Sequence, residues 1–302
     1  MSRQNGGMTR PALSSVTELL KPITWFPPMW AFACGVVASG QSFQDQWFAI
    51  VLGLVLAGPL VCASSQAVND WFDRHVDAIN EPHRPIPSGR IPGQWGLYIA
   101  IFWTGLSLLW AWYLSPWGFA AAGLGLVLAW AYSAPPFRLK QNGWWGNAAC
   151  AMSYEGLAWL TGAAVVLGDV LPEGRSVVLA LLFSFGAHGI MTLNDFKSIE
   201  GDQRMGVGSL PVRLGVTSAA RTACLMMLMP QAVVIVLLLT WQAPWHALGV
   251  ALLMLGQLPM MRRFLQDPVG KALMLSAAGV PLYVSGMMVS AWALRLGHGA
   301  PL

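Results

Sequence analysis

The sequence predicts an all-α protein that crosses a membrane many times, with about nine transmembrane helices. Of its 302 residues, 56% are hydrophobic and only 10% are charged, whereas a soluble domain has roughly 25% charged residues. Long apolar runs alternate with short polar loops, which is the pattern of helices that span a lipid bilayer. The 16 tryptophans suit the same class, because Trp favours the two membrane interfaces.

The apolar runs predict where the spans lie along the chain. They fall at roughly 22–40, 47–69, 95–114, 117–134, 146–168, 175–194, 219–240, 244–262 and 271–294. The first begins with Pro27 and Pro28, so we expect it to be kinked or partly interfacial. No linker or low-complexity segment divides the chain, and residues 1–302 are therefore expected to form a single domain.

The distribution of Lys and Arg predicts the orientation in the membrane. Only Arg175 and Arg295 fall on one side of the predicted spans, which leaves the other 15 of 17 on the opposite side. The positive-inside rule makes that side cytoplasmic, together with the polar residues 1–16. An odd number of spans then places the C-terminus in the periplasm. We attribute the pI near 9.0 to these loops and expect no nucleic-acid partner.

The first polar motif follows the second span. Asp70, Asp73 and Asp77 are spaced three and four residues apart, so they share one face of a helix. Three carboxylates on one face repel one another unless cations lie among them, and oxygen ligands of this kind suit Mg²⁺. The simpler alternative is a solvated helix end.

A second acidic cluster follows the sixth span. Like the first, which begins at Asn69, it opens with an Asn-Asp pair at Asn194. Asp195 and Asp202 are seven residues apart, the same separation as Asp70 and Asp77, with Lys197 and Glu200 between them. Two such clusters at a membrane surface indicate an opposed pair of Mg²⁺ sites that hold one diphosphate.

A third loop on the same side carries Tyr132, Arg138 and Lys140. Such a cation pair is usually a simple membrane anchor. The acids across the same face favour a second role, in which Arg138 and Lys140, with Arg84 and Lys197, bind the diphosphate oxygens that the metal ions leave free.

These motifs resemble a known family. The pattern N-D-x-x-D-x-x-x-D at residues 69–77 is similar to the first motif of UbiA-type intramembrane prenyltransferases. The runs DRHVDAINEPHRPIPSG and NDFKSIEGDQRMGVGSLPVRLG resemble its chlorophyll and bacteriochlorophyll synthase branch, the bacteriochlorophyll enzymes most closely. One departure is Ser198, which stands where much of the family has the first acid of the second motif.

The resemblance implies helices around a central cavity open to the cytoplasm, in a bacterial inner membrane that is either cytoplasmic or intracytoplasmic. It implies Mg²⁺-dependent esterification of a chlorophyllide or bacteriochlorophyllide propionate with geranylgeranyl or phytyl diphosphate. Partners from pigment biosynthesis or photosynthetic assembly are also expected. The implied catalytic, metal-binding residues are Asp70, Asp73, Asp77, Asp195 and Asp202. The implied substrate-binding residues are Asn69, Arg84, Tyr132, Arg138, Lys140, His188, Asn194, Lys197 and Glu200.

Two further residues, His188 and Glu155, each allow alternative roles. His188 precedes Asp195 by seven residues, so it could ligate the metal of a pigment, or instead make a helix–helix hydrogen bond. Glu155, inside the fifth span, would be the coupling residue if the protein were a transporter. Among enzymes, a quinone or haem prenyltransferase of the same family is the second candidate.

Overall fold

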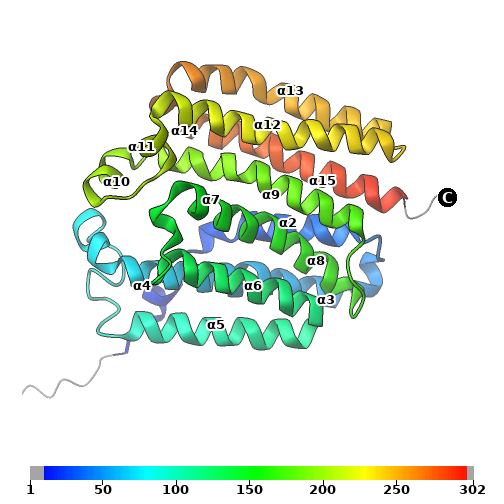
Figure 1. The fold of residues 1–302 in the computed structure, drawn as a ribbon. Coiled ribbons are helices and arrows are strands. Elements are labelled where there is room, and N and C mark those ends of the chain that lie inside the picture. Colours follow the sequence, from blue (N-terminus) through cyan, green and yellow to red (C-terminus); the bar gives the residue numbers. More distant parts are fainter. Residues whose placement is uncertain (1–9, 298–302) are drawn as a thin grey trace, which may run out of the picture.

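The fold is an all-helical bundle, seen here in a computed structural model that describes residues 10–297 (Figure 1). Residues 1–9 of the predicted cytoplasmic N-terminus, and residues 298–302 of the predicted periplasmic C-terminus, lie outside the described range. The α-helices are α1 Leu13–Leu19, α2 Phe26–Ala38, α3 Phe43–Val55, α4 Ala63–Asn80, α5 Trp95–Leu114, α6 Pro116–Ser133, α7 Gly143–Ala151, α8 Ala158–Leu167, α9 Gly174–Asp195, α10 Ile199–Met205, α11 Leu210–Leu214, α12 Val216–Thr240, α13 Pro244–Gln266, α14 Pro268–Met274 and α15 Val280–Gly297.

Every predicted span overlaps at least one of these helices, which confirms the fold class. The predicted count of nine spans is not confirmed. Within residues 10–297, seven helical segments are long and apolar enough to cross a membrane. The apolar helix α2 has only 13 residues, and α6, with 18, is not among the seven.

Three π-helical turns join helices into longer segments. They are η2 Leu56–Cys62, η4 Met152–Leu157 and η5 Leu275–Gly279. Pro59 lies inside η2, and because proline has no backbone N–H it cannot continue the regular helical ladder. Helices α3 and α4 nevertheless form one segment of 38 residues, Phe43–Asn80, which continues well past the predicted end at residue 69.

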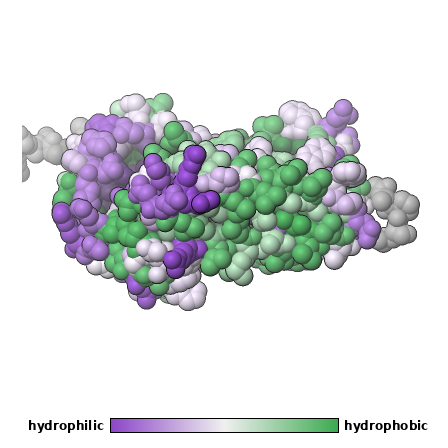
Figure 2. All heavy atoms as spheres, turned by 90° about the horizontal axis from the view of Figure 1, so that it is seen from above, coloured by the Kyte–Doolittle hydropathy of each residue, from purple (hydrophilic) through white to green (hydrophobic). Residues whose placement is uncertain are grey.

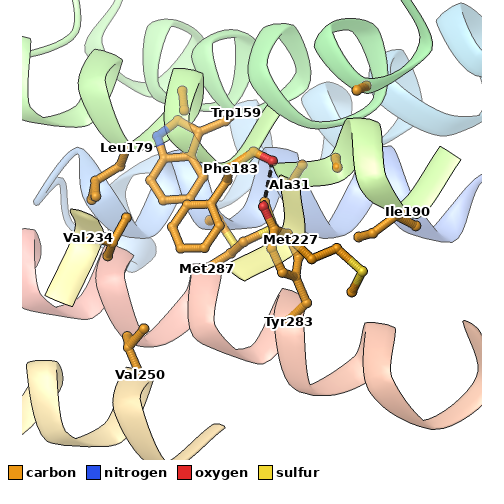
Figure 3. Packing of buried hydrophobic residues seen from close by; sticks show 14 of the residues in the cluster. Ala31, Trp159, Leu179, Phe183, Ile190, Met227, Val234, Val250, Tyr283 and Met287 are labelled. Carbon is orange, nitrogen blue, oxygen red and sulfur yellow. Dashed lines mark hydrogen bonds between the residues drawn. The ribbon is translucent and has the colours of Figure 1, made fainter. Parts of the chain in front are cut away.

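The core of the bundle is built from large side chains and close helix contacts. The ring of Trp159 stacks on that of Phe183 with centroids 6.2 Å apart, and Phe183 meets the ring of Tyr283 edge-to-face at 5.6 Å. The Tyr283 hydroxyl donates a 2.7 Å hydrogen bond to the Phe183 carbonyl (Figure 3). Helices α2 and α8 meet at Gly35 and Gly162. A Cβ at Gly35 would lie 1.9 Å from the carbonyl oxygen of Trp159. Such contact between backbones is typical of membrane helices with small residues at their interface.

Three loops that sequence analysis placed on one side of the membrane do lie at one end of the bundle. They are residues 81–94, residues 134–142 and the segment 196–215 that contains α10 and α11 (Figure 1). The backbone of Gly208 joins two of them, because it accepts from Gly143 at 2.8 Å and donates to Gln141 at 2.9 Å. We call this end the acidic end. Hydrophilic residues gather there, beside a broad hydrophobic surface (Figure 2).

The orientation of the acidic end predicts a labelling pattern. Single cysteines at the exposed positions Ser88, Gln141 and Gln203 should react from the cytoplasmic side, because these loops carry the positive charge. A cysteine at the exposed Asp169, at the opposite end, is the matched control and should react from the periplasm. The measurement is maleimide labelling of inside-out and right-side-out vesicles, after replacement of the four native cysteines. Periplasmic labelling at any of the first three positions would refute this orientation.

Candidate active site

The first acidic cluster lies on the last turns of α4. Asp70 and Asp77 are buried, and Arg84 from the following loop contacts both, at 3.5 Å and 2.9 Å. Asp73 accepts a 2.9 Å hydrogen bond from Asn69. The helical spacing thus brings the three acids and Asn69 to one place, as the sequence predicts.

Two lysines complete this cluster. Lys21 precedes α2 and donates a 2.6 Å hydrogen bond to Asp70, while Lys140 contacts Asp73. Burial lowers the pKa of the Lys140 amino group, and the charge of Asp73 opposes this effect. For Arg84, burial also acts to lower the pKa, but the nearby charges of Asp70, Asp77 and Glu81 are stronger and the net pKa is raised. The neighbouring acids therefore favour the charged form of Arg84, whereas at Lys140 the effect of burial prevails over the charge of Asp73.

The second cluster is built from α9 and α10. Asp195 ends α9 and accepts a 3.0 Å hydrogen bond from Asn147, which also donates to Thr192 at 3.3 Å. Asp202 accepts a 3.0 Å hydrogen bond from Ser198. Ser198, which departs from the family's acidic pattern, therefore positions an acid instead of supplying one.

Tyr132 lies between the two clusters. Its hydroxyl hydrogen-bonds Cys150 and is close to both Asp73 and Asp195. Tyr132 also lines a mainly apolar cavity of about 200 Å³ that reaches Asn69. The cavity extends to Leu157 and Thr161, between α2, α4, α6 and α8, and its walls carry several small side chains such as Ala122 and Gly125. An apolar chain can therefore lie inside the bundle with its polar end among the acids.

The donor set at the acidic end fits Mg²⁺. Oδ2 of Asp70 is buried and, within residues 10–297, has no hydrogen-bond partner, so it is free to ligate a cation. Across the described part of the chain, no three acidic, His or Cys side chains converge into one metal site. Mg²⁺ typically takes only one or two carboxylates and completes its shell with water and phosphate oxygens. Acids that are divided between two clusters, and do not all converge on one point, are consistent with this preference of Mg²⁺ for few carboxylates.

Other predicted residues lie toward solvent. Asn194, Lys197 and Glu200 are exposed, and Glu200 is 3.8 Å from Arg204. Arg138 is partly buried on the loop beside Lys140.

The buried His188 has Nε2 3.1 Å from the carbonyl oxygen of Trp144. This contact is the helix–helix hydrogen bond that the structural alternative for His188 expects. Ligation of a pigment metal through its Nδ1, which has no partner among the described residues, stays a prediction.

Two residues of the site were missed by sequence reasoning. Lys21 pairs with Asp70 across 49 positions, and Asn147 pairs with Asp195 across 48. Lys21 looks like an ordinary membrane anchor, and Asn147 lies within an apolar run. Only the observation that Asn147 is a lone amide inside a predicted span could have singled it out.

Known proteins resemble this chain over most of its length. The model of the UbiA prenyltransferase family matches residues 25–294. A Cereibacter sphaeroides protein named "Bacteriochlorophyll synthase 33 kDa chain" is 56% identical over 94% of both chains. A chloroplastic chlorophyll synthase of Arabidopsis thaliana is 39% identical over 91% of this chain and 73% of its own.

Solved structures of low sequence identity share the fold. A digeranylgeranylglyceryl phosphate synthase has a TM-score of 0.74 at 21% identity, covering 93% of this chain and 98% of its own. An Archaeoglobus fulgidus UbiA homologue bound to GPP and Mg²⁺ has a TM-score of 0.63 at 19% identity, covering 94% and 98%. The family model and the relatives together cover nearly the whole chain, and the chain therefore belongs to the UbiA prenyltransferase family and is a multi-pass membrane prenyltransferase.

Proposed function

We propose that this enzyme esterifies the propionate of bacteriochlorophyllide, or of chlorophyllide as the alternative acceptor, with geranylgeranyl or phytyl diphosphate. Relatives named bacteriochlorophyll synthase support the acceptor, with identities of 56% and 47% to this chain. The observation that carries the donor half is the apolar cavity that reaches the acidic cluster at Asn69. A prenyl diphosphate has the matching form, with an apolar tail and a polyanionic head.

The cavity would hold the tail and keep water from the reacting carbon. Most of its lining is apolar, and Asn69, Gln66 and Tyr132 are among its polar members. The prenyl carbon gains positive character as its bond to the diphosphate weakens, and water would capture it. The enclosed walls therefore favour transfer to the acceptor over hydrolysis.

The acidic end would bind and activate the head of the donor. Mg²⁺, when bound, supplies the positive charge that neutralises the diphosphate leaving group. The residues that would hold it are Asp70, Asp73, Asp77, Asp195 and Asp202. Arg84, Lys140 and Lys197 would donate hydrogen bonds to oxygens on which charge builds during the reaction.

The acceptor needs no strong base. Its carboxylate is already ionised near neutral pH and attacks the first carbon of the prenyl chain. The carbon–oxygen bond to the diphosphate breaks as the ester bond forms, and diphosphate leaves with the electron pair. Family membership and this site both favour an enzyme over a transporter that couples through the buried Glu155.

Product analysis tests the proposal. Purified protein with MgCl₂, bacteriochlorophyllide or chlorophyllide, and geranylgeranyl or phytyl diphosphate should form a prenylated pigment that saponification returns to the free acid. Excess EDTA should stop the reaction. If both pigments stay unmodified while a quinone or haem precursor gains a prenyl group that resists saponification, the proposal is wrong and the second candidate holds.

The cellular setting belongs to the same proposal. The charge distribution supports an orientation with the acidic end at the cytoplasmic face of a bacterial inner membrane, the N-terminus inside and the C-terminus in the periplasm. Enzymes of pigment biosynthesis or photosynthetic assembly on that face would deliver the acceptor.

A further inference from the structure

Arg138 differs from the other cations of the acidic end. Three of them are already paired with acids: Lys21 with Asp70, Arg84 with Asp77 and Lys140 with Asp73. Arg138 forms no ion pair with any described residue, and its Nε is buried without a hydrogen-bond partner. Among the described residues, Lys197 and Arg213 also form no ion pair, but both are exposed, so water satisfies their charged groups.

The backbone presents the Arg138 side chain from an unusual turn. Its φ is 39°, in the left-handed region that residues other than glycine rarely adopt. The conformation is held on both sides, since the Arg138 N–H donates to Ala134 at 3.0 Å and its carbonyl accepts from Gln141 at 2.9 Å. A fixed backbone with a buried and unused guanidinium donor indicates a site prepared for an anion.

Charge balance indicates which anion it takes. The acceptor's carboxylate must approach a centre that already holds several carboxylates and a diphosphate, and like charges repel it. Lys21, Arg84 and Lys140 are engaged with acids that lie where the diphosphate head would bind. A guanidinium fits a carboxylate well, because its N–H groups form a planar fork. We propose that Arg138 binds the carboxylate of the acceptor and aims it at the prenyl carbon. This inference rests on the proposed function.

Phe137 immediately precedes Arg138 in this turn, and Trp145 lies in the first turn of helix α7, which follows the turn. Phe137 is 70% exposed and Trp145 is 67% exposed. Helix α7 begins against the turn, because a Cβ at Gly146 would lie 3.0 Å from the Cα of Lys140. Flat rings beside an unpaired guanidinium suit a planar, apolar acceptor that carries one carboxylate. The tetrapyrrole ring would therefore lie outside the cavity, against Phe137 and Trp145, while its carboxylate reaches inward.

Binding of the acid and of its ester separates this role from others. The probes are chlorophyllide and its propionate methyl ester, titrated by absorption, together with Mg²⁺-pyrophosphate. Wild-type protein should bind the acid more tightly than the ester. Arg138→Gln should weaken binding of the acid by about tenfold or more, as expected when a hydrogen bond to a charged group is lost. Binding of the ester and of pyrophosphate should not change.

Further variants separate the effects of charge and of aromatic contact from general effects of substitution. Arg138→Lys retains the charge and should keep part of the preference for the acid. Arg262→Gln removes an exposed cation of α13 and should change nothing. Trp145→Ala should weaken binding of the acid and of the ester by the same factor. Trp112, near the C-terminal end of α5, is 68% exposed, and Trp112→Ala should weaken binding of neither.

Four outcomes would overturn the inference or its basis. If Arg138→Gln weakens binding of acid and ester equally, Arg138 has a structural role. If it weakens binding of pyrophosphate alone, Arg138 belongs to the donor site. Unchanged binding in Trp145→Ala would remove the aromatic half of the site. Failure of the wild-type protein to bind either pigment would instead overturn the proposed function.

Discussion

Replacing Asp73 with Asn is expected to lower kcat/KM by about 100- to 1,000-fold, the range seen when one charge-stabilising group is removed from an active site. Asp73 joins two parts of the site, since it accepts from Asn69 at the cavity and contacts Lys140 from the next loop. The amide is nearly the same size but cannot ligate Mg²⁺ as an anion or hold Lys140 charged. Asp70→Asn and Asp77→Asn should have losses of the same order.

The control for this series is Asp45→Asn. Asp45 is exposed in the first turn of α3, at the opposite end of the bundle, and its replacement should leave turnover unchanged. Each variant is compared by initial rates in detergent and by the amount of protein in the membrane. Near-normal rates in any two of the three cluster variants would exclude the first cluster from catalysis.

Replacing Gly35 with Leu is expected to prevent stable packing of α2 against α8. A Cβ at Gly35 would lie 1.9 Å from the Trp159 carbonyl oxygen, and a Cβ at Gly162 would lie 2.0 Å from the Phe32 carbonyl oxygen. Because both obstacles are backbone atoms of the facing helix, the helices must separate. We expect a cost of about 3 kcal/mol or more, with a lower Tm and little monodisperse protein after gel filtration.

Gly105→Leu is the matched control, since Gly105 lies mid-helix in α5 and, apart from its chain neighbours and its own helix backbone, no atom of residues 10–297 lies within 4 Å of its ideal Cβ. This variant should keep the wild-type Tm. An unchanged Tm in Gly35→Leu would mean that the two helices do not meet as closely as described.

The sequence predicts those parts of the site that depend on the local periodicity of a helix. Asp70, Asp73 and Asp77 share a face because α4 is a regular helix, and Arg84 follows closely enough to fold back onto them. The expected reaction was inferred from the family resemblance. The spans were also predictable as helices, because apolar length alone defines them.

Other features depend on packing between distant segments. Lys21 reaches Asp70 only because the chain before α2 folds against α4, and Asn147 reaches Asp195 only because α7 packs on α9. The π-helical turn at Pro59 lets one helical segment run from Phe43 to Asn80, where hydropathy predicts an end near residue 69. The exposure of Glu200 likewise follows from the position of α10, not from its sequence.

In the proposed reaction, the acidic end activates a diphosphate as leaving group while a carboxylate attacks carbon. An isotope experiment tests this directly, with a prenyl diphosphate that carries ¹⁸O at the oxygen bridging the first carbon and phosphorus. Mass spectrometry of both products after turnover should find the label in the released diphosphate and none in the pigment ester. Label in the ester would mean that the bridging carbon–oxygen bond stays intact, and that result would contradict the mechanism.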